Sequence, residues 1–489
     1  MIRFLLNNEP VSLDSTCADI TVLQWLRETK LKTGTKEGCG SGDCGACTVV
    51  LASVAKTDDG FRLHYESVNS CISFVGALHA KQLITVEDLA EHEKLHPVQQ
   101  AMVDEGGSQC GFCTPGFIMS MFALYHQDNL PELVKHPKEL HHWIDRGLGG
   151  NLCRCTGYVP IKRAAEQALS NHQPDSFDQA SEKTIRTLQL LQEQLPMHPR
   201  FLSPMNLTEL ADMRLTYPDA RLLAGGTDLA LEVTQQLKDI DHIIYVKQVP
   251  ELLDVSSDAT TLRFGAAVSL NRCMHTLCEV IPGSESMMLR FGSEQVRNQG
   301  TIGGNIVNAS PIGDLPPLLL ALDATLVLQS GEQTRSININ DFYLGYKQTA
   351  MQPDEFLRAI HVPVPDANAQ VFVYKISKRL DDDISAVCGV FCLDIDENRV
   401  LTKVRVAFGG MAATPARAHN VEQALQGLPF VEDTVEAAID ALHNDFSPID
   451  DARASAAYRQ TVAANLIKRC FYQIGAKDTA LQVGEYVSG

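Results

Sequence analysis

Three cysteines within nine residues constrain the fold of this chain more than any other feature. They lie in the segment EGCGSGDCGACTVV, residues 37–50, and a fourth cysteine follows after 23 further residues. The spacing C-x4-C-x2-C with a distant fourth cysteine is that of a plant-type [2Fe-2S] site. The sequence therefore predicts one such cluster, with these ligands: Cys39, Cys44, Cys47 and Cys71.

The same segment contains a glycine pattern with a competing interpretation. Gly40, Gly42 and Gly45 spell G-x-G-x-x-G, the fingerprint of a dinucleotide-binding turn between a strand and a helix. Here the preceding residues, KLKTGTKEG, are polar, and the following residues, CTVVLASV, are typical of a strand. We therefore assign the glycines to a loop that wraps a cluster, where positive φ values and close backbone approach are needed.

A second cysteine set lies further along the chain, as C-x2-C and C-x-C pairs with 39 residues between them. Pro115 and Pro160 each follow a pair and fit the first turn of a helix. Helix N-termini favour anionic groups such as a thiolate-bound cluster. The spacing alone leaves zinc and [2Fe-2S] open, and the neighbouring ferredoxin-type segment favours a second [2Fe-2S] cluster. Its predicted ligands are Cys110, Cys113, Cys153 and Cys155.

Composition limits the class of protein. The chain has 489 residues, a formal net charge of −19 and 14 cysteines. The negative charge argues against nucleic acid, and no apolar stretch reaches the roughly 18 residues of a membrane span. The start, MIRFLLNNEPVSL, does not resemble a signal peptide. We therefore expect a cytoplasmic protein that binds neither nucleic acid nor membrane, and whose clustered cysteines serve redox chemistry.

Hydrophobic patterning divides the chain into five segments, which together predict a multidomain α+β protein. Segment 1–90 shows alternating strands and one helix, and is expected to form a β-grasp, plant-type ferredoxin-like domain. Segment 91–168 is all-α, and 169–197 is a polar linker with one possible helix. Segment 198–370 is an α/β domain of two subdomains. Segment 371–489 is a C-terminal α+β domain with a three-stranded antiparallel sheet.

Two glycine turns in segment 198–370 are candidate phosphate sites. ARLLAGGTDLALEV has the pattern strand, turn, helix, with Gly225, Gly226 and Thr227 at the turn. NQGTIGGNIVNASPIGD contains Gly303 and Gly304, and a proline-rich helix is expected from about Asp314. Two such turns beside helix starts suit the two phosphates of a dinucleotide. A pair of tight turns in an α/β fold is the alternative.

The order of these motifs resembles the xanthine dehydrogenase family of molybdenum hydroxylases, over essentially the whole chain. The matching motifs are EGCGSGDCGACTV, QCGFCTPGFIMS, NLCRCTGY, LLAGGTDL and TIGGNIVNASPIGD. The resemblance is to the bacterial small subunit, which implies two [2Fe-2S] clusters and FAD in this chain. The molybdopterin cofactor would then be held only by a separate large subunit, in a heterotetramer of two small and two large chains.

The resemblance also implies FAD contacts, carried over position by position. The loop at 378–385 matches a mobile segment near the flavin in the family. The implied FAD contacts are Leu222, Leu223, Ala224, Gly225, Gly226, Thr227, Asp228, Leu229, Phe291, Thr301, Ile302, Gly303, Gly304, Asn305, Asp314, Leu357 and Lys375.

The implied function is electron transfer from the partner's molybdenum centre, through two clusters and FAD, to NAD+ during hypoxanthine or xanthine oxidation. The chain shows no general acid or base for the purine step, so we expect no catalytic residue for it here. Three alternatives stay open: a partner that hydroxylates an aldehyde or another heterocycle, a stand-alone flavin and iron–sulfur reductase, and a structural zinc protein. Dioxygen is an alternative final acceptor.

Overall fold

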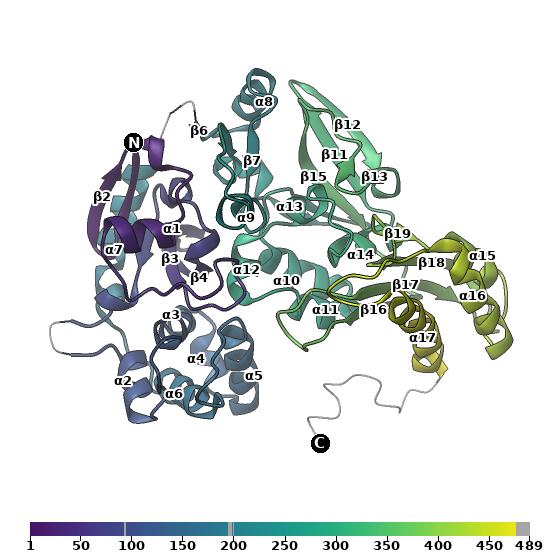
Figure 1. Ribbon diagram of the computed structural model, residues 1–489, viewed down its shortest axis with the longest axis horizontal. Helices are drawn as coiled ribbons and strands as arrows, with labels where there is room; N and C mark the ends of the chain where they lie inside the picture. The colour runs from purple at the N-terminus through teal and green to yellow at the C-terminus, as the bar shows by residue number, and fades with distance from the viewer. Residues whose placement is uncertain (92–93, 194–197, 199, 476–489) are drawn as a thin grey trace. The chain divides into compact units, whose positions relative to one another are not determined.

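The computed structural model describes residues 1–91, 94–193, 198 and 200–475. These form two compact units (Figure 1). The first unit comprises Met1–Pro250 and Gly292–Gly300, and the second comprises Glu251–Phe291 and Thr301–Gly489. Among the described residues, no helix is both long and apolar enough to cross a membrane.

The first unit begins with a five-stranded mixed sheet, which confirms the expected β-grasp domain. Its strand order is β2-β1-β5-β3-β4, in which β1 pairs parallel to β5 and the other pairs are antiparallel. A short helix, α1 (Val22–Gln24), continues as a π-helical turn over Trp25–Thr29. The strands are β1 (Ile2–Leu6), β2 (Glu9–Leu13), β3 (Thr48–Thr57), β4 (Gly60–Asn69) and β5 (Gln82–Ile84).

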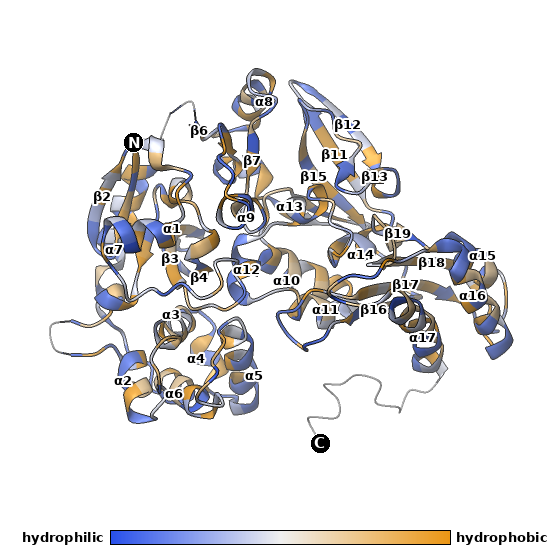
Figure 2. Cartoon of the chain, viewed as in Figure 1, coloured by the Kyte–Doolittle hydropathy of each residue, from blue (hydrophilic) through white to orange (hydrophobic). Residues whose placement is uncertain are grey.

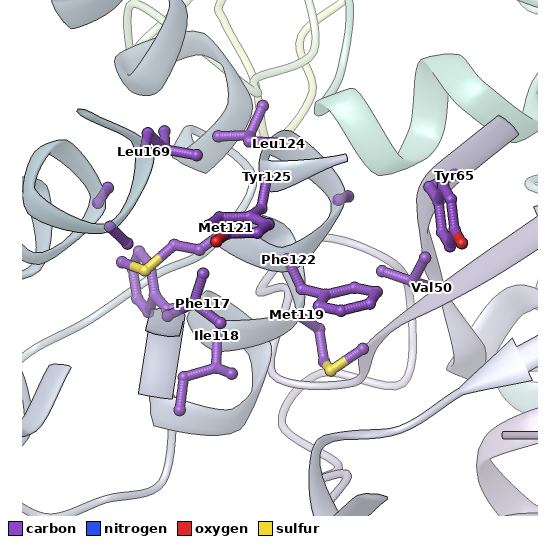
Figure 3. Packing of buried hydrophobic residues seen from close by; sticks show 14 of the residues in the cluster. Val50, Tyr65, Phe117, Ile118, Met119, Met121, Phe122, Leu124, Tyr125 and Leu169 are labelled. Atoms are coloured by element: carbon purple, nitrogen blue, oxygen red, sulfur yellow. The ribbon is translucent and has the colours of Figure 1, made fainter. Parts of the chain in front are cut away.

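Five helices follow, and the central one, α3 (Thr114–Tyr125), is apolar on nearly every side. Its side chains pack with Val50 of β3 and Tyr65 of β4 in one core (Figure 3). A helix that is hydrophobic all round must be enclosed, which explains its position between the sheet and the other helices. The other helices are α2 (Pro97–Asp104), α4 (Leu130–Leu133), α5 (Pro137–Leu148) and α6 (Val159–Ser170).

The segment predicted as a linker contains the expected helix, α7 (Ser176–Gln192). Figure 2 shows its mixed hydropathy, and its apolar residues Phe177 and Leu188 are buried in the same core as α3. Asp175 caps its N-terminus by accepting from the amides of Phe177 and Asp178. The helix is therefore a structural part of the first unit, while residues 194–197 lie outside the described residues.

The first unit also contains a small parallel sheet of order β6-β8-β7 and three short helices. The strand, turn and helix expected around Gly225 are confirmed as β7 and α9. These elements are β6 (Phe201–Leu202), α8 (Leu207–Thr216), β7 (Arg221–Leu223), α9 (Leu229–Thr234), β8 (Ile243–Tyr245) and α12 (Glu294–Gln299).

The part of the second unit before β16 contains a five-stranded antiparallel sheet of order β12-β11-β15-β10-β9, four α-helices and a small hairpin. Its strands are β9 (Val255–Ser257), β10 (Thr261–Gly265), β11 (Thr325–Ser330), β12 (Gln333–Asn338) and β15 (Phe356–Pro363), and the hairpin is β13 (Tyr343–Gly345) with β14 (Gln348–Thr349). Its helices are α10 (Leu270–Val280), α11 (Glu285–Leu289), α13 (Ile302–Val307) and α14 (Leu315–Ala321).

The C-terminal part of the second unit has one more strand than expected. The three predicted strands form, and the two-residue β19 pairs with β18 to give the order β16-β17-β18-β19. A two-residue strand is too short to produce an alternating pattern, so the sequence did not indicate it. The elements are β16 (Ala369–Ile376), β17 (Val387–Ile395), β18 (Leu401–Gly409), β19 (Ala416–Arg417), α15 (His419–Leu425), α16 (Glu432–Asp445) and α17 (Ala456–Gly475).

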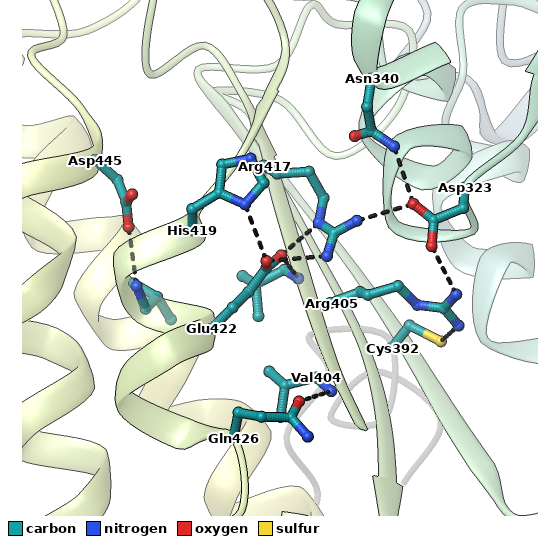
Figure 4. Close-up of polar contacts among 12 residues, drawn as sticks. Asp323, Asn340, Cys392, Val404, Arg405, Arg417, His419, Glu422, Gln426 and Asp445 are labelled. Atoms are coloured by element: carbon teal, nitrogen blue, oxygen red, sulfur yellow. Dashed lines mark hydrogen bonds and ion pairs between the residues drawn. The ribbon is translucent and has the colours of Figure 1, made fainter. Parts of the chain in front are cut away.

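An ion-pair network connects this sheet to the rest of the second unit (Figure 4). Asp323, just after α14, accepts from Arg405 of β18 and Arg417 of β19, each at 2.9 Å. Arg417 also pairs with Glu422 of α15. The arginine side chains are largely buried, so the network is screened by water much less than a surface pair.

Candidate iron–sulfur and flavin sites

The first cysteine loop has the backbone that its glycines predict. Gly40, Gly42 and Gly45 have φ values of 64°, 85° and 66°, in the left-handed region. A Cβ on Gly45 would lie 2.2 Å from the carbonyl oxygen of Gly150, and one on Gly42 would lie 2.6 Å from Ile72. These glycines are thus required by backbone conformation, and at two positions also by close packing.

The loop gathers the four predicted thiols of the first set. The sulfurs of Cys47 and Cys71 lie 3.3 Å apart, and both are buried. Hydrogen bonds from the thiols of Cys44 and Cys71 lower the pKa of Cys39, and the amides of Ser41 and Asp43 also donate to its sulfur. Donors that converge on a sulfur favour the thiolate, which is the form that binds metal.

The second set is assembled from two loops. Cys113 is the N-cap of α3 and contacts Cys153, while Cys110 contacts Cys155. Burial acts to raise the pKa of Cys153, but hydrogen bonds from the hydroxyl and amide of Thr156 outweigh it and lower that pKa to about 7. Cys110 and Cys155 are exposed. One side of the second set, Cys110 and Cys155, therefore lies at the surface of the first unit, while Cys153 is buried.

The sulfur spacing distinguishes a two-iron cluster from a single zinc ion. Tetrahedral zinc with Zn–S bonds of about 2.3 Å would bring all four sulfurs to within ~3.8 Å of one another. In neither cysteine set do three sulfurs lie within 4.8 Å of one another. Two irons spread their ligands over two metal positions, so this wider spacing is compatible with a [2Fe-2S] cluster at each set. No disulfide joins any of the 14 cysteines, all of which are described.

The backbones of the two cysteine loops are hydrogen-bonded to each other. The amide of Leu152, next to Cys153, donates to the carbonyl oxygen of Cys44 at 3.0 Å. The neighbouring Asn151 donates through Nδ2 to the carbonyl oxygen of Gly45, also at 3.0 Å. One hydrogen bond therefore connects the main chain of Cys44, a predicted ligand of the first cluster, to the residue next to Cys153, a predicted ligand of the second.

A group of buried polar side chains around Asn151 supports this contact, and no sequence pattern indicated it. Gln295, fully buried on α12, donates to Ser120 and to the Oδ1 atom of Asn151, each at 3.1 Å. Ser120 donates to the same Oδ1 at 2.6 Å. Single buried amides carry no periodic signal, so only the folded structure brings these side chains together.

The first predicted flavin turn forms between β7 and α9. Gly226 has a φ of 79°, a backbone conformation that a residue with a side chain adopts only with strain. A Cβ on Gly225 would lie 1.9 Å from the carbonyl oxygen of Gln299, at the end of α12. At Gly225 the missing side chain therefore makes room for the backbone of α12.

The second predicted turn is not a strand-to-helix turn. Helix α12 ends at Gln299, and Gly303 and Gly304 lie within the first turn of α13, which Thr301 caps through Gly304. A Cβ on Gly303 would lie 2.4 Å from the carbonyl oxygen of Ala266, whereas one on Gly304 would approach only the Thr301 hydroxyl. The Oδ1 atom of Asn305 is buried and has no hydrogen-bond partner among the described residues. An open glycine face beside an orphaned acceptor fits a polar ligand at this turn.

Two other predicted flavin contacts bind each other. Asp314 and Lys375 form a buried ion pair, and Ser385 donates to the second carboxylate oxygen of Asp314 at 2.6 Å. Ser385 was not predicted. Leu357 is buried in the core of the second unit, and Phe291 packs against the same core. The turn 222–229 belongs to the first unit, whereas 301–305, Phe291, Asp314, Leu357 and Lys375 belong to the second.

Family models match almost the whole chain in consecutive order. Residues 4–76 match the 2Fe-2S iron-sulfur cluster binding domain, and 85–166 match the [2Fe-2S] binding domain. Residues 196–365 match the FAD binding domain in molybdopterin dehydrogenase, and 372–474 match the CO dehydrogenase flavoprotein C-terminal domain.

Full-length relatives point to the same family. Xanthine dehydrogenase of Emericella nidulans is 30% identical over 97% of this chain and 38% of its own length. Xanthine dehydrogenase 1 of Arabidopsis thaliana is 31% identical over 89% of this chain and 37% of its own length. The chain thus spans less than two-fifths of these relatives.

Solved structures share the fold of about half of the chain. A carbon monoxide dehydrogenase of Hydrogenophaga pseudoflava has a TM-score of 0.53 and 27% identity, and covers 56% of this chain and 96% of its own. Quinoline 2-oxidoreductase of Pseudomonas putida 86 has a TM-score of 0.52 at 24% identity, with 57% and 96% covered. The chain belongs to the molybdenum hydroxylase family of oxidoreductases, and carries two [2Fe-2S] domains and an FAD-binding domain.

Proposed function

We propose that this chain is the electron-transfer subunit of a xanthine dehydrogenase, which passes electrons from a molybdenum-bearing partner to NAD+. The observation that carries the proposal is the joined pair of cysteine loops, in which the Leu152 amide donates to the Cys44 carbonyl. The clusters carry single electrons, and flavin exchanges both single electrons and hydride, so their combination suits transfer to NAD+. We assign no general acid or base for the purine step to this chain.

The cofactor assignments rest on the geometry of each turn and loop. We propose the eight cysteines of the two sets as cluster ligands, because the sulfurs of each set are spread more widely than one tetrahedral zinc ion requires. We propose that the residues at 222–229 and 301–305 contact FAD, supported by the positive φ of Gly226 and the open face of Gly304. Asp314, Lys375, Phe291 and Leu357 remain proposed flavin contacts.

The proposed partner is a large chain that holds the molybdopterin cofactor, in a heterotetramer of two small and two large chains. Its docking is supported by apolar side chains that are exposed beside the second cysteine set: Phe112, Tyr158 and Val159. The exposed Cys110 and Cys155 lie in the same loops. Exposed aromatic residues of this kind are typical of protein–protein contact sites.

The xanthine assignment is supported by relatives of that name, which align over nearly the whole chain. A second candidate is a partner that hydroxylates another small substrate, supported by the carbon monoxide dehydrogenase structure at 27% identity. Copurification of the chain with its partner separates the two. The complex is expected to reduce NAD+ with xanthine; activity only with carbon monoxide, an aldehyde or quinoline would favour the second candidate.

The cluster assignment has its own test in the Cys44→Ser variant. Because Cys44 belongs to only one set, the reduced variant should lose or change one paramagnetic signal and keep the other. The measurement is electron paramagnetic resonance. Before substitution, the iron content should be about four atoms per chain. Cys273→Ser, which alters a buried thiol outside both sets, is the control and should keep both signals. Two unchanged signals in Cys44→Ser would refute the assignment.

A further inference from the structure

A buried group of histidine and aspartate side chains lies in the first unit, at the ends of three helices. His96 is the N-cap of α2, His126 follows the last residue of α3, and Asp175 is the N-cap of α7. Asp178 lies one turn into α7. The side chains of His96, His126 and Asp175 are 3%, 2% and 7% exposed, so water does not compensate their polar atoms.

The hydrogen bonds of His126 leave one ring nitrogen available. Its Nδ1 lies 3.0 Å from the carbonyl oxygen of Phe122, and because a carbonyl only accepts, Nδ1 carries the proton. In the neutral ring, Nε2 then presents a lone pair. Nε2 is buried without a hydrogen-bond partner among the described residues, although it lies 3.1 Å from the Oδ2 atom of Asp175.

This arrangement is typical of two ligands of one metal ion. Two ligands of a tetrahedral ion with bonds near 2.0 Å are separated by ~3.3 Å, close to the observed contact. A lone pair and a carboxylate oxygen repel each other at this distance unless a proton or a metal cation lies between them. A metal-binding histidine also commonly donates its other ring N–H to a backbone carbonyl, as His126 does to Phe122.

Asp175 is held by its neighbours in the orientation that this role requires. Its Oδ1 accepts from the amides of Phe177 and Asp178 at 2.8 and 3.0 Å. Its Oδ2 lies 2.7 Å from Nε2 of His96, and His96 Nδ1 accepts from the Val98 amide, so the proton is on Nε2 and is donated to Asp175. Such donors fix the position of a metal-binding carboxylate.

We propose that His126, Asp175 and Asp178 bind a divalent transition-metal ion of the zinc class. One ligand atom from each of the three lies within 4.8 Å of the others, and no other group of three among the described residues does so. Two carboxylates and a neutral imidazole suit such an ion in charge and in ligand type. The ion would join the end of α3, whose N-cap is Cys113, to the start of α7. The proposed cluster ligands and flavin contacts do not depend on this metal ion.

The test is zinc binding by the full protein with both clusters loaded, so that the cysteines are occupied. One zinc ion per chain is expected after gel filtration, measured by elemental analysis together with iron. Asp178→Asn keeps an oxygen that can accept from the Asp175 amide, and His126→Gln keeps a polar side chain. Each of these two variants should weaken zinc binding at least tenfold, measured by calorimetry. His96→Gln should weaken it about 10- to 100-fold, because it removes the hydrogen bond that supports Asp175.

The matched control is His142→Gln, because His142 also places Nδ1 2.9 Å from the carbonyl four residues earlier but is exposed and outside this group. It should bind zinc like the unaltered protein. Absence of one bound zinc per chain in the cluster-loaded protein would overturn the proposal. Equal zinc affinity in Asp178→Asn, His126→Gln and the control would overturn it as well, and would leave His126 as an ion-pair partner of Asp175.

Discussion

At the scale of single residues, His79 is a buried imidazole whose environment opposes its charge. The side chain is 2% exposed, and its Nδ1 accepts from the Arg3 amide at 3.1 Å. Burial lowers the pKa of His79 to about 4, below its value of about 6.5 in an unfolded chain. Between these two pH values the unfolded chain binds a proton that the folded chain does not, so stability falls as the pH falls.

We therefore predict that His79→Asn reduces the acid sensitivity of the first unit. Over the window from about pH 6.5 to 4 the unaltered protein should lose about 3 kcal/mol more unfolding free energy than the variant. Denaturant unfolding at several pH values, followed by the visible circular dichroism of the clusters, measures this difference. His142→Asn, at an exposed site, should keep the slope of the unaltered protein. Equal slopes in His79→Asn and the unaltered protein would contradict the prediction.

Gly304 gives a residue-scale test of the flavin site that does not disturb the backbone. It lies in the first turn of α13, and a Cβ there would approach only the Thr301 hydroxyl, at 2.9 Å. Gly304→Val should therefore fold but block close approach of FAD, so the purified variant should contain little flavin and keep both cluster signals. Ala437→Val, on the exposed side of α16, should retain FAD. Full flavin occupancy in Gly304→Val would remove the residue from the site.

At the scale of elements, the short helix α12 stabilises the first unit through buried polar contacts. Asn151 lies between Gln295 of this helix and the first cysteine loop, and bonds both. Asn151→Leu would leave several buried polar groups unsatisfied and should lower the unfolding free energy by about 3 kcal/mol. Thermal unfolding of the cluster-loaded protein tests this. Asn171→Leu, whose amide bonds an exposed carbonyl, should change stability by less than about 0.5 kcal/mol.

The sequence predicted those elements whose signals are local. Pro115 and Pro160 indicated the starts of α3 and α6, and alternation indicated β3, β4 and β16 to β18, all of which form. It missed β19, which has two residues, and described Gly303 as part of a turn although it lies in α13. The contacts of Asn151 and His126 join residues far apart in the chain, so no local pattern could indicate them.

At the scale of the whole molecule, the matched domains predict which half of the proposed reaction this chain carries out and which half its partner carries out. This chain carries two [2Fe-2S] domains and an FAD-binding domain, and we assign the molybdenum chemistry to the partner. In the function we propose, NADH exchanges electrons with the flavin, and xanthine is oxidised at the molybdenum centre of the partner. The flavin half should therefore react in the isolated chain and the purine half should not.

We predict that the isolated chain, shown first to contain its clusters and FAD, is bleached by NADH under anaerobic conditions. The flavin absorbance should fall first, and the cluster absorbance should follow as electrons redistribute within the chain. Xanthine should leave the spectrum unchanged, and adding the molybdenum-bearing partner should restore bleaching by xanthine. The Gly304→Val variant serves as the control, because a chain without flavin should lose the response to NADH while dithionite still reduces its clusters. Bleaching by xanthine with no molybdenum present would show that the proposed division between the two chains is wrong.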